Sequence, residues 1–539
     1  MQNVRRAPTI ARNGMVVSSH HLASATGMSV LRGGGNAVDA AIAANAVLSV
    51  VEPAMCGLGG DLFMLIWEAK TRKLHALNAS GRSPYGVDLG WFRERGITKM
   101  PLGGAPTIST PGAIDGWVVA NERFGRKPLR ELLEPAIGYA ADGYPLHGHL
   151  SRRMHLGNKL LAGNPIASEI YLRDGKPAVV GEMMRNPRMA GALRSVAEEG
   201  RATLYEGGLL GRAVLSTCEA LGWPLTQRDL SDQHAEWVEP ITTSYRGKTI
   251  VELPPPNQGM TTQIAMNVLE GYDLRQHGFG TTEAMHLQLE ATRAAFDARN
   301  RLCADPAFFD VPLQELLSAD YAERVRRAID SARTSRQPAP ATAPSTKSGD
   351  TIYLCTADGE GNCVSLIQSL YATWGSGIMA GDLGFFLQSR NSGLVLDANH
   401  PSGYQPRKRP FHTLAPAMIF ENGEPWLLYG TRGADAQPQV QIQLLCNLVD
   451  FGMNLQEALD APRWRISGTY QDPEPAIPLL ESRFSPETFA GLQSKGHTPR
   501  WMEAADDDRG HASAIIVDRT NGTLLGAYDL RSDGAAVGY

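Results

Sequence analysis

The first eighty residues show a helical apolar pattern followed by an extended one. An alanine-rich run of good helix formers, residues 37–51, follows Asn36, a residue type that caps helices well. This pattern predicts a buried helix that begins after Asn36. Two further apolar runs, residues 62–67 and 74–78, are separated by a short polar turn and therefore predict a strand, a turn and a second strand.

The apolar pattern predicts that the middle of the chain is mainly helical. Helices are predicted over residues 129–142, 189–199, 204–221, 282–302 and 321–332. They are interrupted at residues 253–259, where three consecutive prolines require an extended segment, because proline fixes φ and has no N–H to donate.

The composition changes abruptly near residue 333. Residues 334–349 are polar and rich in proline, which predicts a mobile surface linker. The chain therefore divides into a helical and mixed part, residues 1–350 with the linker at about 333–350, and a β-rich part, residues 351–539. Three hairpins are predicted in the β-rich part, one on strands 351–357 and 363–370 and two at the turns Asn422-Gly423 and Asn521-Gly522.

Composition and charge narrow the classes of function. The 51 Lys and Arg against 56 Asp and Glu leave a net charge of -5, so no nucleic acid partner is expected. No apolar run reaches the length of a membrane span, and the N-terminus lacks the apolar core of a secretory signal, which predicts a cytoplasmic protein without a membrane partner. The six cysteines show no C-x-x-C spacing and are expected to be buried small apolar residues.

The linker ends in residues that can carry chemistry. Ser348-Gly-Asp-Thr351 places a hydroxyl directly before a predicted strand. Cleavage between Asp350 and Thr351 would give Thr351 a free α-amine beside its hydroxyl nucleophile. The ordinary pKa of such an amine, about 7.7 to 8.0, suits a general base at neutral pH. Taken alone, the same residues describe an ordinary turn that enters a strand, and it is their surroundings that favour the chemical interpretation.

Several segments resemble the signatures of the γ-glutamyltranspeptidase family, in the same order along nearly the whole chain. They are Gly34-Gly-Asn-Ala-Val-Asp-Ala-Ala, Gly57-Leu-Gly-Gly-Asp-Leu-Phe-Met-Leu, Thr110-Pro-Gly-Ala-Ile-Asp-Gly, Pro254-Pro-Pro-Asn-Gln-Gly, Asp358-Gly-Glu-Gly-Asn-Cys-Val-Ser-Leu, Gly375-Ser-Gly, Lys408-Arg-Pro and Asp529-Leu-Arg-Ser. The resemblance implies the four-layer αββα sandwich of the N-terminal nucleophile hydrolases. It also implies a precursor that cleaves itself before a threonine into a large and a small chain, which remain one intertwined domain.

The same resemblance assigns the catalytic residues. Thr351 is the implied nucleophile, Asp350 and Thr351 flank the implied cleavage point, and Ser369 supports the nucleophile. The two glycines of the family's oxyanion hole correspond to Gly433-Ala434. Alanine keeps its backbone N–H, so this pair can still donate hydrogen bonds. No metal or cofactor is implied.

The expected substrate pocket departs from the family pattern. Where the family binds the substrate α-ammonium with an asparagine, a glutamine and an aspartate, this chain has Tyr371, Arg390 and Gly393. The two serines that bind the α-carboxylate correspond to His412-Thr413. Because a guanidinium group pairs with carboxylate and not with ammonium, glutathione is disfavoured as a substrate.

Two more arginines add to this departure. Arg82 lies near the position of the family's carboxylate-binding arginine, and Arg432 adjoins the oxyanion hole. The resemblance therefore implies hydrolysis of a small amide that carries a carboxylate and no free ammonium, such as oxamate or a glutaryl amide. His412 is equally well explained as a structural imidazole. Arg390 and Arg432 also have a structural interpretation, as surface residues or as partners of acidic neighbours such as Asp382, Asp397 or Asp435.

Other functions stay open at this point. They are a true γ-glutamyltransferase or glutathione hydrolase, a glutaryl or cephalosporin acylase, a metal-dependent amidohydrolase and a non-catalytic binding protein. His147-Gly-His149, with His155 nearby, has the H-x-H spacing of metal-dependent amidohydrolases, although the strand and helix alternation of a barrel is missing. The sequence does not say which acyl group is preferred, or whether pairs of large and small chains associate into dimers.

Overall fold

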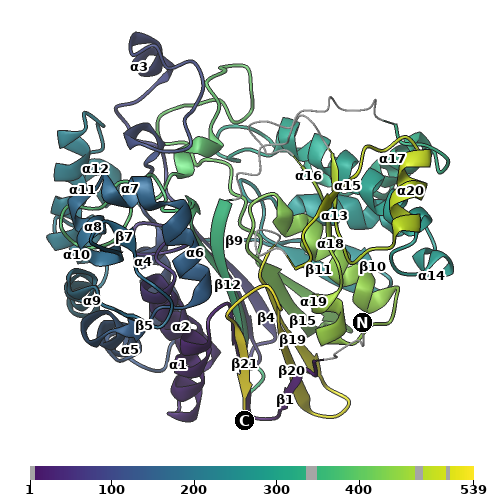
Figure 1. The fold of residues 1–539 in the computed structure, drawn as a ribbon, viewed down its shortest axis with the longest axis horizontal. Coiled ribbons are helices and arrows are strands. Elements are labelled where there is room, and N and C mark those ends of the chain that lie inside the picture. Colours follow the sequence, from purple (N-terminus) through teal and green to yellow (C-terminus); the bar gives the residue numbers. More distant parts are fainter. Residues whose placement is uncertain (1–5, 336–348, 468–476, 506–509) are drawn as a thin grey trace.

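The computed structural model describes residues 6–335, 349–467, 477–505 and 510–539, which are arranged in four layers (Figure 1). Two seven-stranded sheets lie in the middle, and helices cover both outer faces. The β12 sheet has the strand order β21 (Ala535–Gly538), β2 (Gly14–Ser18), β12 (Gly349–Asp358), β13 (Cys363–Ala372), β3 (Asp61–Glu68), β4 (Lys73–Ala79) and β9 (Glu236–Val238). The β15 sheet has the order β1 (Thr9–Ala11), β20 (Thr523–Tyr528), β19 (Ala512–Asp518), β15 (Glu424–Thr431), β14 (Ala417–Glu421), β11 (Lys248–Glu252) and β10 (Ile241–Tyr245).

A different set of helices covers each sheet. The β12 sheet is covered by helices from the first part of the chain, α1 (His21–Arg32), α2 (Ala37–Val51) and α4 (Ala113–Phe124). Helix α5 (Leu129–Asp142) packs on α2, α9 (Pro187–Glu199) packs on α5, and α6 (Gly148–Leu156) lies on the same side of the molecule. The β15 sheet is covered by α13 (Gly259–Leu269), α18 (Ala436–Val449) and α19 (Leu455–Asp460), and α15 (Thr282–Leu302) packs on α13.

The side-chain alternation of β12 explains the layering. Ile352 and Leu354 face the helices and belong to the core around α2, whereas Tyr353 and Cys355 face the second sheet and pack in the core between the sheets. A strand buried on both faces reads as a nearly continuous apolar run, because neighbouring residues point to opposite sides. The arrangement is the αββα sandwich that the resemblance implied, and that prediction is confirmed.

Most of the predicted elements are confirmed. Helix α2 begins after Asn36 with a capping box that includes Asp39. Helices α5 and α15 have the predicted bounds, and the three hairpins form as β12–β13, β14–β15 and β19–β20. All six cysteines are free and buried, as expected. In the described part of the chain, no helix is both long and apolar enough to cross a membrane.

Two helix predictions need correction. The run 204–221 is not one helix but two, α10 (Ala202–Tyr205) and α11 (Leu209–Ala220), because Gly207 between them has a left-handed φ of +82°. The helix predicted over 321–332 is α17 (Ala319–Ala328), which ends four residues early. Most of the predicted mobile linker, residues 336–348, lies outside the described residues.

Candidate active site at the start of β12

Thr351 lies at an irregular point in the pairing of β12 with β13. Asp350 pairs with Tyr371 and Ile352 pairs with Gln368, so the register shifts at Thr351 and forms a bulge. Bulges redirect side chains and are common beside active sites. The bulge sets the Thr351 side chain apart from the regular alternation of the strand.

Two hydroxyl groups connect Thr351 to the carbonyl group that precedes it. Thr351 Oγ1 donates to Ser369 Oγ at 3.1 Å, and Ser369 Oγ donates to the Asp350 carbonyl oxygen at 2.8 Å. The Tyr371 N–H donates to Ser369 Oγ at 2.7 Å and fixes the serine. This chain of donors makes the carbonyl carbon more electrophilic and the threonine oxygen more nucleophilic.

The glycines before β3 let the chain approach Ser369 closely. A Cβ on Gly60 would lie 2.6 Å from the Ser369 carbonyl oxygen, so only glycine fits there. The next residue, Asp61, pairs with Ser369 across β3 and β13. Its carboxylate accepts a hydrogen bond from the Gln388 amide at 3.0 Å and lies 2.8 Å from the His412 imidazole.

The Asp350 side chain is held by two arginines and a hydroxyl, a group called the carboxylate clamp and formed by Arg153, Thr373 and Arg432. Arg432 Nη1 donates to Asp350 Oδ1 at 2.6 Å, and Arg153 Nη2 lies 3.4 Å from the same oxygen. The Thr373 hydroxyl donates to Oδ2. Arg432 therefore pairs with an acid, but not with one of the neighbours that the sequence suggested.

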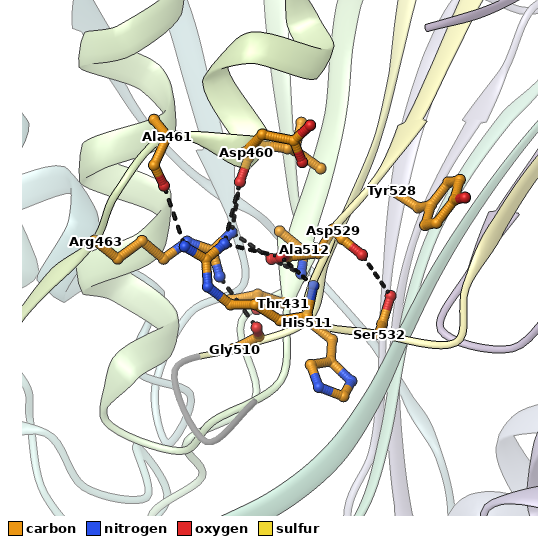
Figure 2. Close-up of polar contacts among 12 residues, drawn as sticks. Thr431, Asp460, Ala461, Arg463, Gly510, His511, Ala512, Tyr528, Asp529 and Ser532 are labelled. Atoms are coloured by element: carbon orange, nitrogen blue, oxygen red, sulfur yellow. Dashed lines mark hydrogen bonds and ion pairs between the residues drawn. The ribbon is translucent and has the colours of Figure 1, made fainter. Parts of the chain in front are cut away.

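A buried ion-pair network fixes the segment beside the clamp (Figure 2). Arg463, which follows α19, pairs with Asp529 and donates to the Gly510 carbonyl oxygen at 3.0 Å. Asp529 also accepts the N–H of the residue after His511 at 3.0 Å. His511 is thereby held with its Nε2 3.0 Å from Arg432 Nη2. The terminal Asp529-Leu-Arg-Ser segment thus positions His511 by a backbone hydrogen bond, and His511 in turn contacts Arg432 of the clamp.

Gly433 and Ala434 follow Arg432 in the connection between β15 and α18. Both have left-handed backbone conformations, with φ of +118° and +50°. Their carbonyl oxygens accept hydrogen bonds from the first turn of α18. Within the described residues, neither of their N–H groups has an acceptor, as an oxyanion hole requires. The left-handed φ of Ala434 also shows why glycine is the easier residue at this position.

Arg390 is a buried guanidinium group that has no carboxylate partner among the described residues. Its side chain is 0% exposed and begins the turn η2 (Arg390–Gly393). Nη1 donates to Thr413 Oγ1 at 3.4 Å, whereas Nε and Nη2 have no hydrogen-bond partner. The guanidinium lies 4.4 Å from the ring centroid of Tyr371, the residue that pairs with Asp350.

The charge state of this pair follows from its burial. Burial lowers the pKa of Arg390 to about 10 and raises the pKa of Tyr371 to about 12. At neutral pH Arg390 is therefore a cation and Tyr371 a neutral phenol. The buried Arg390 guanidinium offers positive charge and N–H donors, which suit a carboxylate or carbonyl oxygen and not an ammonium group.

Comparisons with known proteins identify the family of the chain. The family model described as Gamma-glutamyltranspeptidase matches residues 23–539. The chain belongs to the gamma-glutamyltranspeptidase family. It is 39% identical to the Glutathione hydrolase-like YwrD proenzyme of Bacillus subtilis over 530 residues, 98% of this chain and 99% of that protein. It is 34% identical to the Oxamate amidohydrolase proenzyme of Klebsiella pneumoniae over 536 residues, 98% of this chain and 99% of that protein.

A solved structure of an acylase shares the fold. The cephalosporin acylase from Bacillus halodurans superposes with a TM-score of 0.91 at 33% identity, covering 99% of this chain and 97% of the acylase. The chain is thus an enzyme of the gamma-glutamyltranspeptidase family, whose similar members are hydrolases that are named proenzymes.

His412 and Arg82, two of the residues predicted to bind a carboxylate, already form polar contacts with other residues of the protein. His412 Nε2 lies 2.8 Å from Asp61 Oδ2, and Nδ1 lies 2.8 Å from the Pro410 carbonyl oxygen, which favours the structural interpretation of His412. Arg82 Nη2 donates to Glu236 at 3.0 Å.

Glu236 is shared between two arginines. Arg409 Nη1 donates to its second oxygen at 2.8 Å. Burial disfavours the charged carboxylate, but the hydrogen bonds and charges of Arg409 and Arg82 prevail and lower the pKa of Glu236 to about 2. Arg82 therefore already has an anionic partner, unlike Arg390.

The H-x-H histidines do not form a metal cluster in the described structure. His147 Nδ1 lies 2.7 Å from Asp533 Oδ2 and its Nε2 lies 2.9 Å from the Val51 carbonyl oxygen, while His155 Nδ1 lies 2.8 Å from the Ser151 carbonyl oxygen. These bonds position α6, the helix that carries Arg153.

One group of side chains elsewhere in the described residues has metal-ligand spacing. It consists of His286, Glu290 and His497. Arg293 Nη1 donates to Glu290 at 2.5 Å and lies 3.1 Å from His497 Nδ1, and the two histidines contact each other at 2.8 Å. The Arg293 guanidinium group therefore already supplies the positive charge that a metal ion would bring to this cluster.

Three residues around the clamp were missed by sequence reasoning. Arg153, Thr373 and His511 lie far from one another in the chain and meet only through the fold. Thr373 lies four residues after Ser369, and this short separation is the one local feature of the sequence that links a clamp residue to the predicted site. Nothing in the sequence distinguishes Arg153 from the other arginines.

Proposed function

We propose that the protein is a proenzyme that cleaves itself between Asp350 and Thr351 and then hydrolyses a small carboxylate-bearing amide through an acyl-enzyme. The observation that carries the proposal is the hydrogen-bonded sequence from Thr351 Oγ1 through Ser369 Oγ to the Asp350 carbonyl oxygen. It joins a nucleophile, a proton relay and an electrophile in one buried array.

Self-cleavage would proceed by an acyl shift. Thr351 Oγ1 attacks the Asp350 carbonyl carbon, its proton passes to Ser369, and the C–N bond breaks as the Thr351 nitrogen takes up a proton. The resulting ester is hydrolysed by water, which leaves a carboxylate on Asp350 and a free amine on Thr351. The products are a large chain, residues 1–350, and a small chain, residues 351–539.

The new amine would then serve as the base for substrate turnover. It accepts the Thr351 hydroxyl proton as the oxygen attacks the amide carbonyl of the substrate. The N–H groups of Gly433 and Ala434 would stabilise the oxyanion. The amine of the substrate leaves with the proton, and water hydrolyses the acyl-threonine ester.

The substrate class is inferred from charge. Arg390 presents a buried cation and two nitrogens without protein acceptors beside Tyr371. A free α-ammonium would meet like charge there, whereas a carboxylate or carbonyl oxygen would satisfy the donors. The relative named oxamate amidohydrolase supports this reading, and the acylase relatives make a glutaryl amide the second candidate.

Two experiments test the proposal. Electrophoresis with N-terminal sequencing should find a small chain that starts at Thr351, and Thr351→Ala should abolish both cleavage and turnover. A fully active, uncleaved 58.3 kDa chain would contradict the threonine assignment. A panel of oxamate, a glutaryl amide and a γ-glutamyl anilide tests the pocket, because faster turnover of the γ-glutamyl compound would make the protein a glutathione hydrolase instead.

A further inference from the structure

His412 and Asp61 form a buried acid–imidazole pair beside the proposed nucleophile. Both side chains are 0% exposed, and His412 Nε2 lies 2.8 Å from Asp61 Oδ2. Asp61 on β3 pairs with Ser369 on β13. His412 is followed by Thr413, whose hydroxyl accepts a hydrogen bond from Arg390. The pair therefore adjoins both the Ser369 relay and the Arg390 guanidinium group.

The contacts of the imidazole fix the number of protons on this pair. His412 Nδ1 lies 2.8 Å from the Pro410 carbonyl oxygen, which can only accept, so Nδ1 carries a hydrogen. Nε2 faces a carboxyl oxygen, and a bare nitrogen lone pair would repel an ionised carboxylate there. A proton therefore lies between Nε2 and Asp61 Oδ2. The pair is an imidazolium with a carboxylate or an imidazole with a carboxylic acid, and its net charge is zero in both forms.

The surroundings of the pair are compatible with this proton count. The other oxygen of Asp61 accepts hydrogen bonds from the Gly81 N–H and the Gln388 amide, both at 3.0 Å. Burial and the charge of Arg390 lower the pKa of His412, which favours the form in which the ring is neutral. Because neither side chain of the pair is exposed, solvent screens its charge little. The net charge of the pair therefore matters to its neighbours.

This net charge decides how much of the Arg390 charge is left for a ligand. In the described structure, the acidic groups that act on Arg390 are Asp61 and Tyr371. Burial raises the pKa of Tyr371 to about 12, so the phenol is neutral. Asp435, another acid that acts on Tyr371, is paired with Arg299 at 2.5 Å. An ionised Asp61 alone would neutralise Arg390, but the shared proton cancels its charge.

We propose that His412 is a specificity-determining residue, because by sharing a proton with Asp61 it leaves the charge of Arg390 available to the carboxylate of the substrate. The inference rests on the proposed function, in which Arg390 attracts a carboxylate-bearing acyl group. An amide or hydroxyl side chain at residue 412 could donate a hydrogen bond to Asp61 but could not neutralise it. Asp61 would then cancel the charge of Arg390, and a substrate such as oxamate would lose its attraction to the site.

The test compares two variants that alter the same contact but change its charge in opposite ways. His412→Gln keeps a donor toward Asp61 and leaves the carboxylate unneutralised. Asp61→Asn removes the acid and keeps a donor toward the imidazole. The substrates are oxamate and its neutral diamide, oxamide, and the readout is the KM of oxamate divided by that of oxamide. An inhibition constant replaces the KM of a compound that is not turned over.

The two variants should differ in this ratio at neutral pH. His412→Gln should raise it about tenfold or more, because an added negative charge opposes the carboxylate and not the neutral amide, whereas Asp61→Asn should keep it within about threefold of the native enzyme. The ratio cancels changes that affect both compounds, including any change at Thr351. A purely structural contact would predict similar ratios for the two variants, and that result would overturn the inference.

A matched control comes from another histidine of the same sheet. His75 Nε2 on β4 lies 3.5 Å from Glu68 Oε2, and His75 pairs with Ile66, five residues after Asp61 on β3. His75→Gln makes the same substitution in a histidine–carboxylate contact and should leave the ratio unchanged. A rise equal to that of His412→Gln would overturn the inference.

A measurement without variants covers the case in which either substitution prevents folding. A neutron structure of the perdeuterated enzyme should show deuterium on His412 Nδ1 and between Nε2 and Asp61 Oδ2, and its absence from the second position would overturn the inference. Faster turnover of a γ-glutamyl anilide than of oxamate would instead contradict the proposed function. If a glutaryl amide is the preferred substrate, the same ratio is taken with the neutral diamide of glutaric acid.

Discussion

Removal of the Ser369 hydroxyl isolates the step that the proposed mechanism depends on most. Ser369 Oγ accepts from Thr351 Oγ1 at 3.1 Å and from the Tyr371 N–H at 2.7 Å, and donates to the Asp350 carbonyl oxygen at 2.8 Å. A proton relay contributes about 10²–10⁴ in rate and an oxyanion donor about 10²–10³. Because one hydroxyl does both, the two effects are not additive. Ser369→Ala should slow self-cleavage by about 10²–10⁴, a barrier increase of about 3 to 5 kcal/mol.

The assay follows conversion of the 58.3 kDa precursor into two chains over time on a denaturing gel. Ser369→Ala also leaves buried backbone groups without a partner, at about 1–3 kcal/mol each, so folding needs a control. Ser365→Ala is that control, since it removes a buried hydroxyl from the same strand, 2.8 Å from the Tyr353 hydroxyl and away from the scissile bond. Cleavage of Ser369→Ala at a rate within about threefold of the control would refute the relay, because the smallest expected effect is about a hundredfold.

Three further predictions follow from the charges around the site. Arg390→Gln should raise kcat/KM for a γ-glutamyl anilide relative to oxamate by about tenfold or more, because it removes a like charge from the ammonium; an unchanged ratio would contradict that role. Glu236→Gln should lower the Tm most above pH 5. Its two arginine partners lower the pKa of Glu236 to about 2, so their stabilisation is complete above the ordinary carboxyl pKa of about 4.3 and disappears as the pH falls toward 2. Calorimetry at several pH values should therefore find a Tm difference that closes on acidification, and a constant difference would count against the pairing. Asp529→Asn should lower the free energy of unfolding in urea by about 3–5 kcal/mol, because two buried arginines lose their shared carboxylate; a loss below about 1 kcal/mol would show that the network in Figure 2 is not structural.

The sequence predicted local structure well where the signals were local. The Asn36 cap, the turns at Asn422 and Asn521 and the alternation along β12 each depend on residues within one element. The prediction failed at residues 204–221, where the apolar periodicity continues across Gly207 although the helix does not. The order of strands in the two sheets was not predictable from periodicity, and only the resemblance supplied the αββα architecture.

The candidate site likewise contains some residues that the sequence could bring together and others that it could not. Thr351 and Ser369 lie on paired strands of one hairpin, so their proximity follows from a short-range pattern together with the resemblance. The clamp brings together α6, the end of β15 and the residue after β13, and no sequence signal joins those three places. The sequence identified Arg432 but could not find its partner, because Asp350 was read as part of the scissile bond and not as a side chain.

The topology also explains how a break at this bond would leave the fold intact. Only Gly349 and Asp350 of β12 precede the bond, and the pairings from Ile352 to Ala357 follow it. On the other side, β12 pairs with β2 of the first part of the chain from Leu354 onward, and β13 pairs with β3. The β12 sheet therefore interleaves strands from both sides of the bond, and each chain supplies core to the other. Separation would require the sheet to open, so the two chains should remain together until the protein unfolds, with Thr351 presented at the end of a strand that is held on both edges.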